Sequence, residues 1–155
     1  MKITIIGTGY VGLVTGTCFS EFGHEIICID RDKRKINELL AGKIPIYEPG
    51  LQDLVLKNMQ EKRLRFDTDA GKAVPWADTV FIAVGTPSSR RGDGYADLTF
   101  IYEAAREIAP LLTGYTLIVN KSTAPAGTAR QIARIIRETN PAADCRIWGQ
   151  AVRSL

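Results

Sequence analysis

The residues best suited to chemistry stand at the amino terminus, in the run Gly7-Thr8-Gly9-Tyr10-Val11-Gly12. The run fits the pattern G-x-G-x-x-G, follows an apolar strand-like stretch and opens a helix-like one, as in nucleotide-binding strand–helix–strand units. Gly7 would permit a tight turn, Gly9 would let the backbone approach a pyrophosphate, and Gly12 would let the helix pack on the strand. Unpaired N–H groups at the start of the helix favour anionic phosphates.

An acidic residue, Asp30, ends the second strand-like stretch. It follows the glycines at about the twenty-residue spacing of the carboxylate that binds the adenosine ribose hydroxyls. Its charge would repel a 2′-phosphate, which favours NAD over NADP, although Lys33, Arg34 and Lys35 could accommodate extra negative charge. The alternative without a ligand is a purely structural glycine turn beside a solvated acid. That alternative requires all these features to coincide by chance, so the pattern predicts an NAD site.

The rest of the chain supplies elements that would position these residues. Short apolar runs such as residues 3–6 and 79–84 are typical of strands buried on both faces, and helix-like patterns alternate with them. This alternation predicts an α/β fold: a doubly wound parallel sheet of the Rossmann type, with about six strands and ligands at their carboxyl ends.

Composition narrows the function classes. The chain has 155 residues, 45% hydrophobic and 24% charged, and a net charge of +3, which fits one globular domain. Without a dense basic face or a known module, we expect no nucleic-acid binding. No apolar run approaches a membrane span and no signal peptide is evident, so we expect no membrane association. Three cysteines without CxxC spacing indicate free thiols in a reducing, cytoplasmic compartment.

None of the three cysteines is predicted to be a nucleophile. Cys28 lies in the second strand pattern, and Cys145 lies in a carboxyl-terminal stretch without a recognisable motif. We expect the first helix to bury one apolar face, made of Val11, Val14, Cys18 and Phe22. Thiols buried on apolar faces are inert, since a reactive thiolate needs an accessible, electropositive site.

Beyond these patterns, residues 1–19 closely resemble the start of bacterial UDP-glucose 6-dehydrogenases. Four further segments agree with the same nucleotide-sugar 6-dehydrogenase family, in order: residues 44–51, 83–87, 96–98 and 121–128. The resemblance extends from Met1 to about Asp144. Tyr47 within the second segment favours the UDP-glucose branch over the GDP-mannose branch.

The resemblance implies roles for individual residues. The family oxidises the primary alcohol of a sugar to a carboxylate and reduces two NAD. The pyrophosphate would be held by the turn that includes Gly7, Gly9, Tyr10, Val11 and Gly12. Asp30 and Lys35 would hold the adenosine ribose end. Thr86 would line the nicotinamide side, and Thr123 would contact the cofactor and help to position the reactive water.

The resemblance stops after Asp144. The family continues there with an Asn-Pro-Glu-Phe-Leu segment, whereas residues 145–155 read as an atypical tail after an NAD-binding domain at residues 1–144. A reading-frame shift or a premature stop near Cys145 would account for the change. The family's catalytic lysine, nucleophilic cysteine, central helix and UDP-sugar domain have no counterpart, so we expect NAD binding without turnover of UDP-glucose.

Three hypotheses follow for the function. The first is the amino-terminal part of a UDP-glucose 6-dehydrogenase. The second is the same part of a GDP-mannose or UDP-N-acetylmannosamine dehydrogenase. The third is a non-catalytic nucleotide-binding module that associates, as a homodimer, through exposed apolar surface.

Overall fold

The computed structural model describes residues 1–88 and 96–149. Its strands form one parallel sheet in the order β3-β2-β1-β4-β5-β6. They are β1 (Lys2–Ile6), β2 (Glu25–Ile29), β3 (Leu64–Asp67), β4 (Thr79–Ile82), β5 (Thr116–Asn120) and β6 (Cys145–Gly149). The predicted doubly wound sheet is confirmed.

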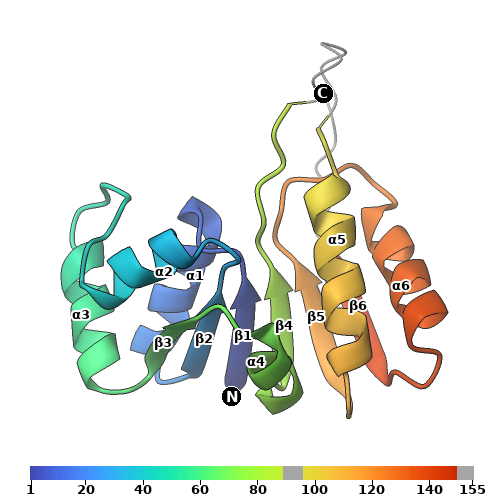
Figure 1. The fold of residues 1–155 in the computed structure, drawn as a ribbon, viewed down its shortest axis with the longest axis horizontal. Helices are drawn as coiled ribbons and strands as arrows, with labels where there is room; N and C mark the ends of the chain where they lie inside the picture. The colour runs from blue at the N-terminus through green and yellow to red at the C-terminus, as the bar shows by residue number, and fades with distance from the viewer. Residues whose placement is uncertain (89–95, 150–155) are drawn as a thin grey trace.

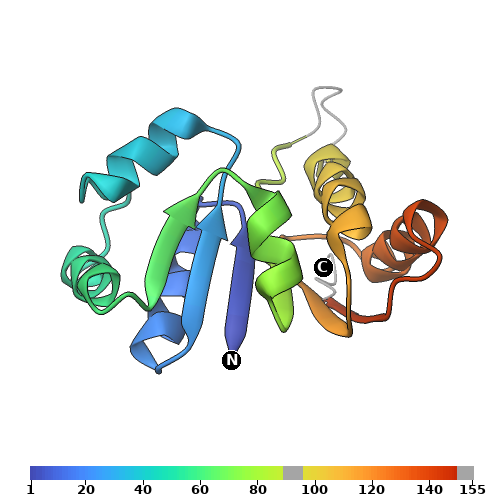
Figure 2. The same ribbon diagram turned by 60° about the horizontal axis from the view of Figure 1, so that its bottom comes forward.

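Helices cover both faces of this sheet. They are α1 (Tyr10–Glu21), α2 (Lys33–Leu40), α3 (Leu51–Gln60), α4 (Ala70–Trp76), α5 (Thr99–Ile108), the 3-10 turn η1 (Ala109–Leu111) and α6 (Thr128–Thr139). Figures 1 and 2 show α1, α2 and α3 grouped around β1–β3, and α5 and α6 beside β4–β6. Within residues 1–88 and 96–149, no helix has the length and apolarity needed to cross a membrane.

Strand β2 shows why a continuous apolar run suits a central position. Ile27 and Ile29 belong to the core cluster that includes residues of α4, α5 and α6. Ile26 and Cys28 point the other way, into the cluster built with α1, α2 and α3. Alternate side chains of a strand leave opposite faces, so a strand covered on both sides is apolar at every position.

The prediction that α1 buries a face made of Val11, Val14, Cys18 and Phe22 is wrong except at Val14, which is partly buried against the core. Cys18 is exposed, and Val11 and Phe22 are 41% and 77% exposed. The face turned to the sheet is composed mainly of small residues: Gly12, Leu13, Gly16, Thr17 and Ser20. A Cβ on Gly16 would lie only 2.7 Å from the Cys28 Sγ. Because helix and sheet approach so closely, the residues of α1 that face the sheet must be small, and their hydrophobicity matters less.

The stretch after Asp144 begins with a strand. Residues of β6 pair in parallel with β5, from Cys145 opposite Thr116 to Gly149 opposite Asn120. The sheet therefore continues past the domain boundary expected at residue 144, and residues 150–155 lie outside the described part of the chain.

The strand order fixes where a ligand can bind. The chain proceeds from β1 outward to β2 and β3, then returns to place β4 on the other side of β1. The two halves of the sheet thus diverge between β1 and β4. In doubly wound folds, ligands bind in the crevice at this switch point, beyond the carboxyl ends of the strands.

Candidate dinucleotide site

The glycine turn lies at this switch point, between β1 and α1. Gly7 has a φ of +107°, and its N–H donates to the Ile29 carbonyl at 2.7 Å. A Cβ on Gly7 would lie 2.6 Å from the Ala83 carbonyl oxygen, and a Cβ on Gly12 would lie 1.9 Å from the Gly7 carbonyl oxygen. Both positions therefore exclude every side chain, which explains two of the three glycines by packing alone.

Gly9 differs from the other two glycines. Its φ of −70° suits any residue, and a Cβ there would meet no atom within 4 Å. It caps the start of α1 without a side-chain hydrogen bond, so the first turn of the helix keeps N–H groups available. Because the protein itself leaves this space open, the glycine fits a backbone that a ligand must approach closely.

Asp30 lies just beyond β2 and is held in place by its neighbours. Its Oδ2 accepts hydrogen bonds from the Thr8 hydroxyl at 2.7 Å and from the Thr8 N–H at 3.0 Å. Its Oδ1 accepts from the Asp32 N–H at 3.0 Å, and the Lys35 Nζ lies 4.0 Å from Oδ2. The carboxylate is thus fixed at the end of the glycine turn, with its side chain 15% exposed.

This environment keeps Asp30 ionised. Partial burial would by itself raise the pKa of Asp30, but the hydrogen bonds from Asp32 and Thr8, together with the charge of Lys35, outweigh burial and lower the pKa below its ordinary value. A lowered pKa means that the interactions are present above the unfolded value of about 3.9 and are lost as the pH falls through the folded value.

Replacing Asp30 tests its role in binding. We expect Asp30→Asn to weaken NAD binding by about ten- to a hundredfold, since a charged hydrogen-bond partner contributes about 1.5–3 kcal/mol. We also expect the wild-type affinity to stay constant between about pH 8 and about pH 5, because the carboxylate remains charged there. Calorimetric titration measures both. Asp53→Asn, on the exposed side of α3, is the matched control; equal affinities for both variants would contradict the assignment.

A cavity of about 370 Å³ lies beside Asp30. It is lined by Ile6, Gly7, Gly9, Ile29, Asp30, Arg31, Lys35, Ala83, Val84, Gly85, Phe100, Ala104 and Glu107. The structure therefore brings Gly7, Gly9, Asp30 and Lys35 together around one space, as the sequence predicted. The apolar lining from β1, β2, the segment after β4 and α5 suits a flat nucleoside base, and the polar groups of the cavity suit a ribose.

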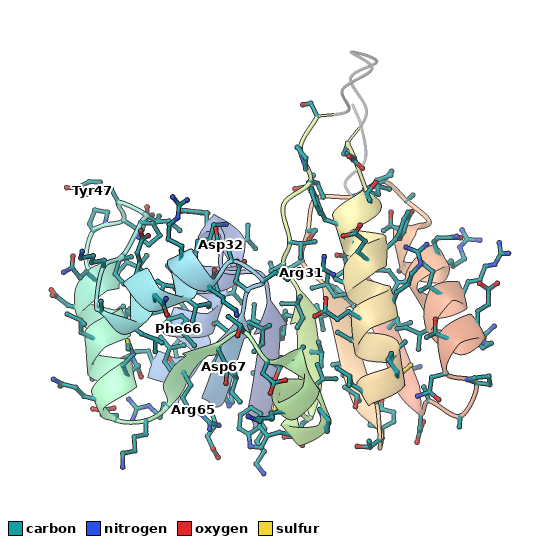
Figure 3. All side chains as sticks on the ribbon, viewed as in Figure 1. Arg31, Asp32, Tyr47, Arg65, Phe66 and Asp67 are labelled. Atoms are coloured by element: carbon teal, nitrogen blue, oxygen red, sulfur yellow. The ribbon has the colours of Figure 1, made fainter. Side chains whose placement is uncertain are left out.

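Tyr10 and Val11 begin α1 outside this cavity and are 54% and 41% exposed. The Tyr10 hydroxyl donates to the Glu48 Oε1 at 3.2 Å, and the negative charge of Glu48 raises the pKa of the phenol. This contact links the glycine turn to the irregular segment before α3. Tyr47 in the same segment is 94% exposed and lies at the outer edge of the molecule (Figure 3).

Thr86 and Thr123 follow β4 and β5 at the carboxyl edge of the sheet. Ser122 joins their two loops: its Oγ donates to the Val84 carbonyl at 2.8 Å, and its N–H donates to the Ile82 carbonyl at 3.3 Å. Thr86 is half-buried and Thr123 is exposed, and neither lines the cavity. The structure thus brings the residues predicted for the adenosine end of NAD around one cavity, whereas the two threonines predicted for the nicotinamide end lie outside it.

Sequence reasoning missed Thr8, Arg31 and Glu107. Thr8 occupies a variable position of the glycine motif, yet it is 2% exposed and holds Asp30 with two hydrogen bonds. Arg31 and Glu107 line the cavity from elements far apart in the chain. The position of Arg31 directly after the acid was a usable signal, whereas nothing in the sequence pairs it with α5.

The parallel sheet, the glycine turn at its switch point and an acid beyond β2 define the class: a Rossmann-type dinucleotide-binding domain. A family model described as UDP-glucose/GDP-mannose dehydrogenase family, NAD binding domain, matches residues 1–149. The chain belongs to this family, and its cofactor is NAD. The match includes β6 and continues past the boundary expected at residue 144.

Individual relatives agree with this family. A UDP-glucose 6-dehydrogenase of Rhizobium meliloti (strain 1021) is 59% identical over 147 residues, covering 95% of this chain and 33% of the relative. UDP-glucose 6-dehydrogenase TuaD of Bacillus subtilis (strain 168) is 51% identical over 139 residues, covering 90% of this chain and 30% of TuaD. The chain thus spans about a third of the length of these curated relatives.

Solved structures agree on the fold. A GDP-mannose dehydrogenase from Pseudomonas aeruginosa, solved as a ternary complex, superposes with a TM-score of 0.90 at 36% identity, covering 96% of this chain and 35% of that one. A UDP-glucose dehydrogenase from Pyrobaculum islandicum gives a TM-score of 0.89 at 34% identity, covering 97% and 35%.

Proposed function

We propose that this chain is the NAD-binding part of a UDP-glucose 6-dehydrogenase and that, on its own, it binds NAD without oxidising a nucleotide sugar. The observation that carries the proposal is the Asp30 carboxylate, fixed by Thr8 beside a cavity that also contains Gly7 and Gly9. NAD, when bound, supplies the hydride acceptor. The open space at Gly9 and the ionised acid fit its pyrophosphate and ribose.

The remaining roles follow the direction in which NAD would lie in the site. The turn from Gly7 to Gly12, with Tyr10 and Val11, would hold the pyrophosphate, and Lys35 would assist Asp30 at the ribose. Thr86 and Thr123 would serve the nicotinamide side, where Thr123 would help to position water in the complete enzyme. Both roles are supported by the position of the two threonines at the same edge of the sheet, where a hydrogen bond from Ser122 joins the loop after β5 to the segment after β4.

Absence of turnover by the chain alone is supported by its thiols. Burial raises the pKa of the Cys28 thiol to about 12, and partial burial with the Asp144 charge raises that of Cys145. Cys18 is exposed on α1, and no cysteine lines the cavity. The three free thiols also fit a cytoplasmic location, which we propose.

UDP-glucose is the sugar nucleotide that we propose for the complete enzyme, because two curated relatives at 59% and 51% identity carry that name. GDP-mannose is the alternative, favoured by the solved structure at 36% identity. The test follows NADH absorbance after the chain is mixed with NAD and either sugar nucleotide. We expect no NADH from either mixture, and steady NADH formation would refute the lack of turnover.

We also propose that a second copy of the chain covers an open face of the sheet. Opposite α5 and α6, a groove of about 460 Å³ is lined by Phe81, Leu117, Val119, Lys121, Arg146, Ile147 and Trp148. Trp148 is 57% exposed there. Parallel sheets are ordinarily covered on both faces, and the same face of a second copy would bury these apolar groups in a two-fold contact.

The dimer makes a measurable prediction. We expect the mass from light scattering to approach that of a dimer with rising concentration, and Trp148→Ser to shift it toward a monomer. Added salt should favour the dimer, because Lys121 and Arg146 of the two copies would approach one another. Phe22→Ser, which replaces an exposed aromatic residue on α1, is the control. A monomeric mass at all concentrations would refute this proposal.

A further inference from the structure

Arg31 presents an apparent conflict in the cofactor site. It directly follows Asp30 and lines the same cavity. An acid at the end of the second strand favours the ribose hydroxyls of NAD, whereas a nearby arginine is the group that accommodates the 2′-phosphate of NADP. Its planar guanidinium suits a phosphate because it can donate two parallel hydrogen bonds. The sequence Asp30-Arg31 therefore contains a determinant for each cofactor.

The structure shows that the Arg31 guanidinium already has partners. Its Nε and Nη2 donate to the Glu107 Oε2 at 3.0 and 2.6 Å, and its Nη1 donates to the Glu103 Oε2 at 3.0 Å. Both glutamates lie on α5, one turn apart, on the far side of the cavity from β2. Figure 3 shows Arg31 extending from the end of β2 toward α5. The edge of the guanidinium that would grip a phosphate is occupied by Glu107.

The charges around this edge disfavour a further anion. Among the residues that form ion pairs at this edge, Asp30, Glu103 and Glu107 contribute three carboxylates, against the two cations Arg31 and Lys35. A 2′-phosphate monoester carries between about one and two negative charges at neutral pH, so it would meet a net negative cluster. The Arg31 and Glu103 side chains are 62% and 41% exposed, and exposed pairs contribute little to stability. Cofactor selection is a better explanation of this arrangement than stability.

We propose that Glu103 and Glu107 are specificity residues: they hold the Arg31 guanidinium and so withhold it from the 2′-phosphate of NADP. Discrimination against NADP then depends on two layers, the Asp30 carboxylate beside the ribose and the two glutamates on α5. The inference rests on the assigned NAD site, and it concerns only which dinucleotide that site accepts.

The double variant Glu103→Ala/Glu107→Ala tests this proposal by calorimetric titration with NAD and with NADP. We expect the NADP affinity to rise about tenfold relative to the NAD affinity of the same variant, as for one regained charge-assisted contact. Glu138→Ala is the matched control, because its ion pair with Arg134 lies on the exposed side of α6. It should leave both affinities unchanged.

A triple variant identifies the group responsible. Adding Arg31→Ala to the double variant should abolish the gain in NADP affinity, because the freed guanidinium is the proposed phosphate ligand. An unchanged NADP affinity in the double variant, or a gain that persists without Arg31, would overturn the proposal. Failure of the wild-type chain to bind NAD would instead refute the proposed function, and this inference with it.

Discussion

Gly12→Ala is expected to lower the free energy of unfolding by at least about 3 kcal/mol, the upper range of overpacking effects. The added methyl group would lie 1.9 Å from the Gly7 carbonyl oxygen and 3.4 Å from the Ala83 Cβ. Because its nearest neighbour is backbone, α1 would have to move away from β1. Urea denaturation of the wild-type and variant chains measures the loss.

Two other glycines calibrate this result. Gly16→Ala should destabilise less, because its nearest contacts are the side-chain atoms Cys28 Sγ and Ile5 Cδ1, which can shift. Gly114→Ala is the control, since a Cβ there meets nothing within 4 Å, and its effect should stay within about 0.5 kcal/mol. A Gly12→Ala chain as stable as the Gly114→Ala chain would show that helix and strand do not approach as closely as described.

Gly9→Ala, in contrast to Gly12→Ala, is expected to leave the free energy of unfolding unchanged and to cause a large loss of NAD affinity. Its backbone conformation suits alanine, and the protein leaves the space around its Cβ empty. A bound pyrophosphate would need that space, and a steric cost of about 1–3 kcal/mol corresponds to a loss of about five- to 150-fold.

The measurement pairs calorimetric titration with urea denaturation on the same Gly9→Ala sample. The Gly114→Ala chain again serves as the control, here for binding. Wild-type NAD affinity in the Gly9→Ala chain would place the pyrophosphate elsewhere. A large loss of stability would show instead that Gly9 is required by the fold.

The sequence predicted the architecture because each strand is a short apolar run between helices, and parallel strands need that pattern. It also predicted that Gly7, Gly9 and Asp30 share one site, because the strand–helix–strand unit carries them in a fixed local arrangement, and the resemblance to the family added Lys35.

The buried face of α1 could not be predicted from hydrophobicity. Its contact with β1 and β2 is so close that Gly12 and Gly16 form it, while the more apolar Val11 and Phe22 remain exposed. Periodicity detects large apolar side chains, and it fails where a backbone approaches a sheet directly.

The partners of Arg31 could not be predicted from the sequence either. Glu103 and Glu107 are more than 70 residues away along the chain, and only the return of the chain through β4 brings α5 to the end of β2. The sequence suggested that Lys33, Arg34 and Lys35 could accommodate the extra charge of NADP and did not single out Arg31, which in the fold is held by two carboxylates. Contacts of this kind depend on topology, which single residues do not encode.

We propose that this chain binds NAD by itself and does not bind the sugar nucleotide. Isothermal titration of the unmodified chain with NAD, and separately with UDP-glucose, tests it most directly. We expect saturable binding of NAD and no measurable heat of binding with UDP-glucose. Absence of NAD binding, or tight binding of UDP-glucose, would contradict this account.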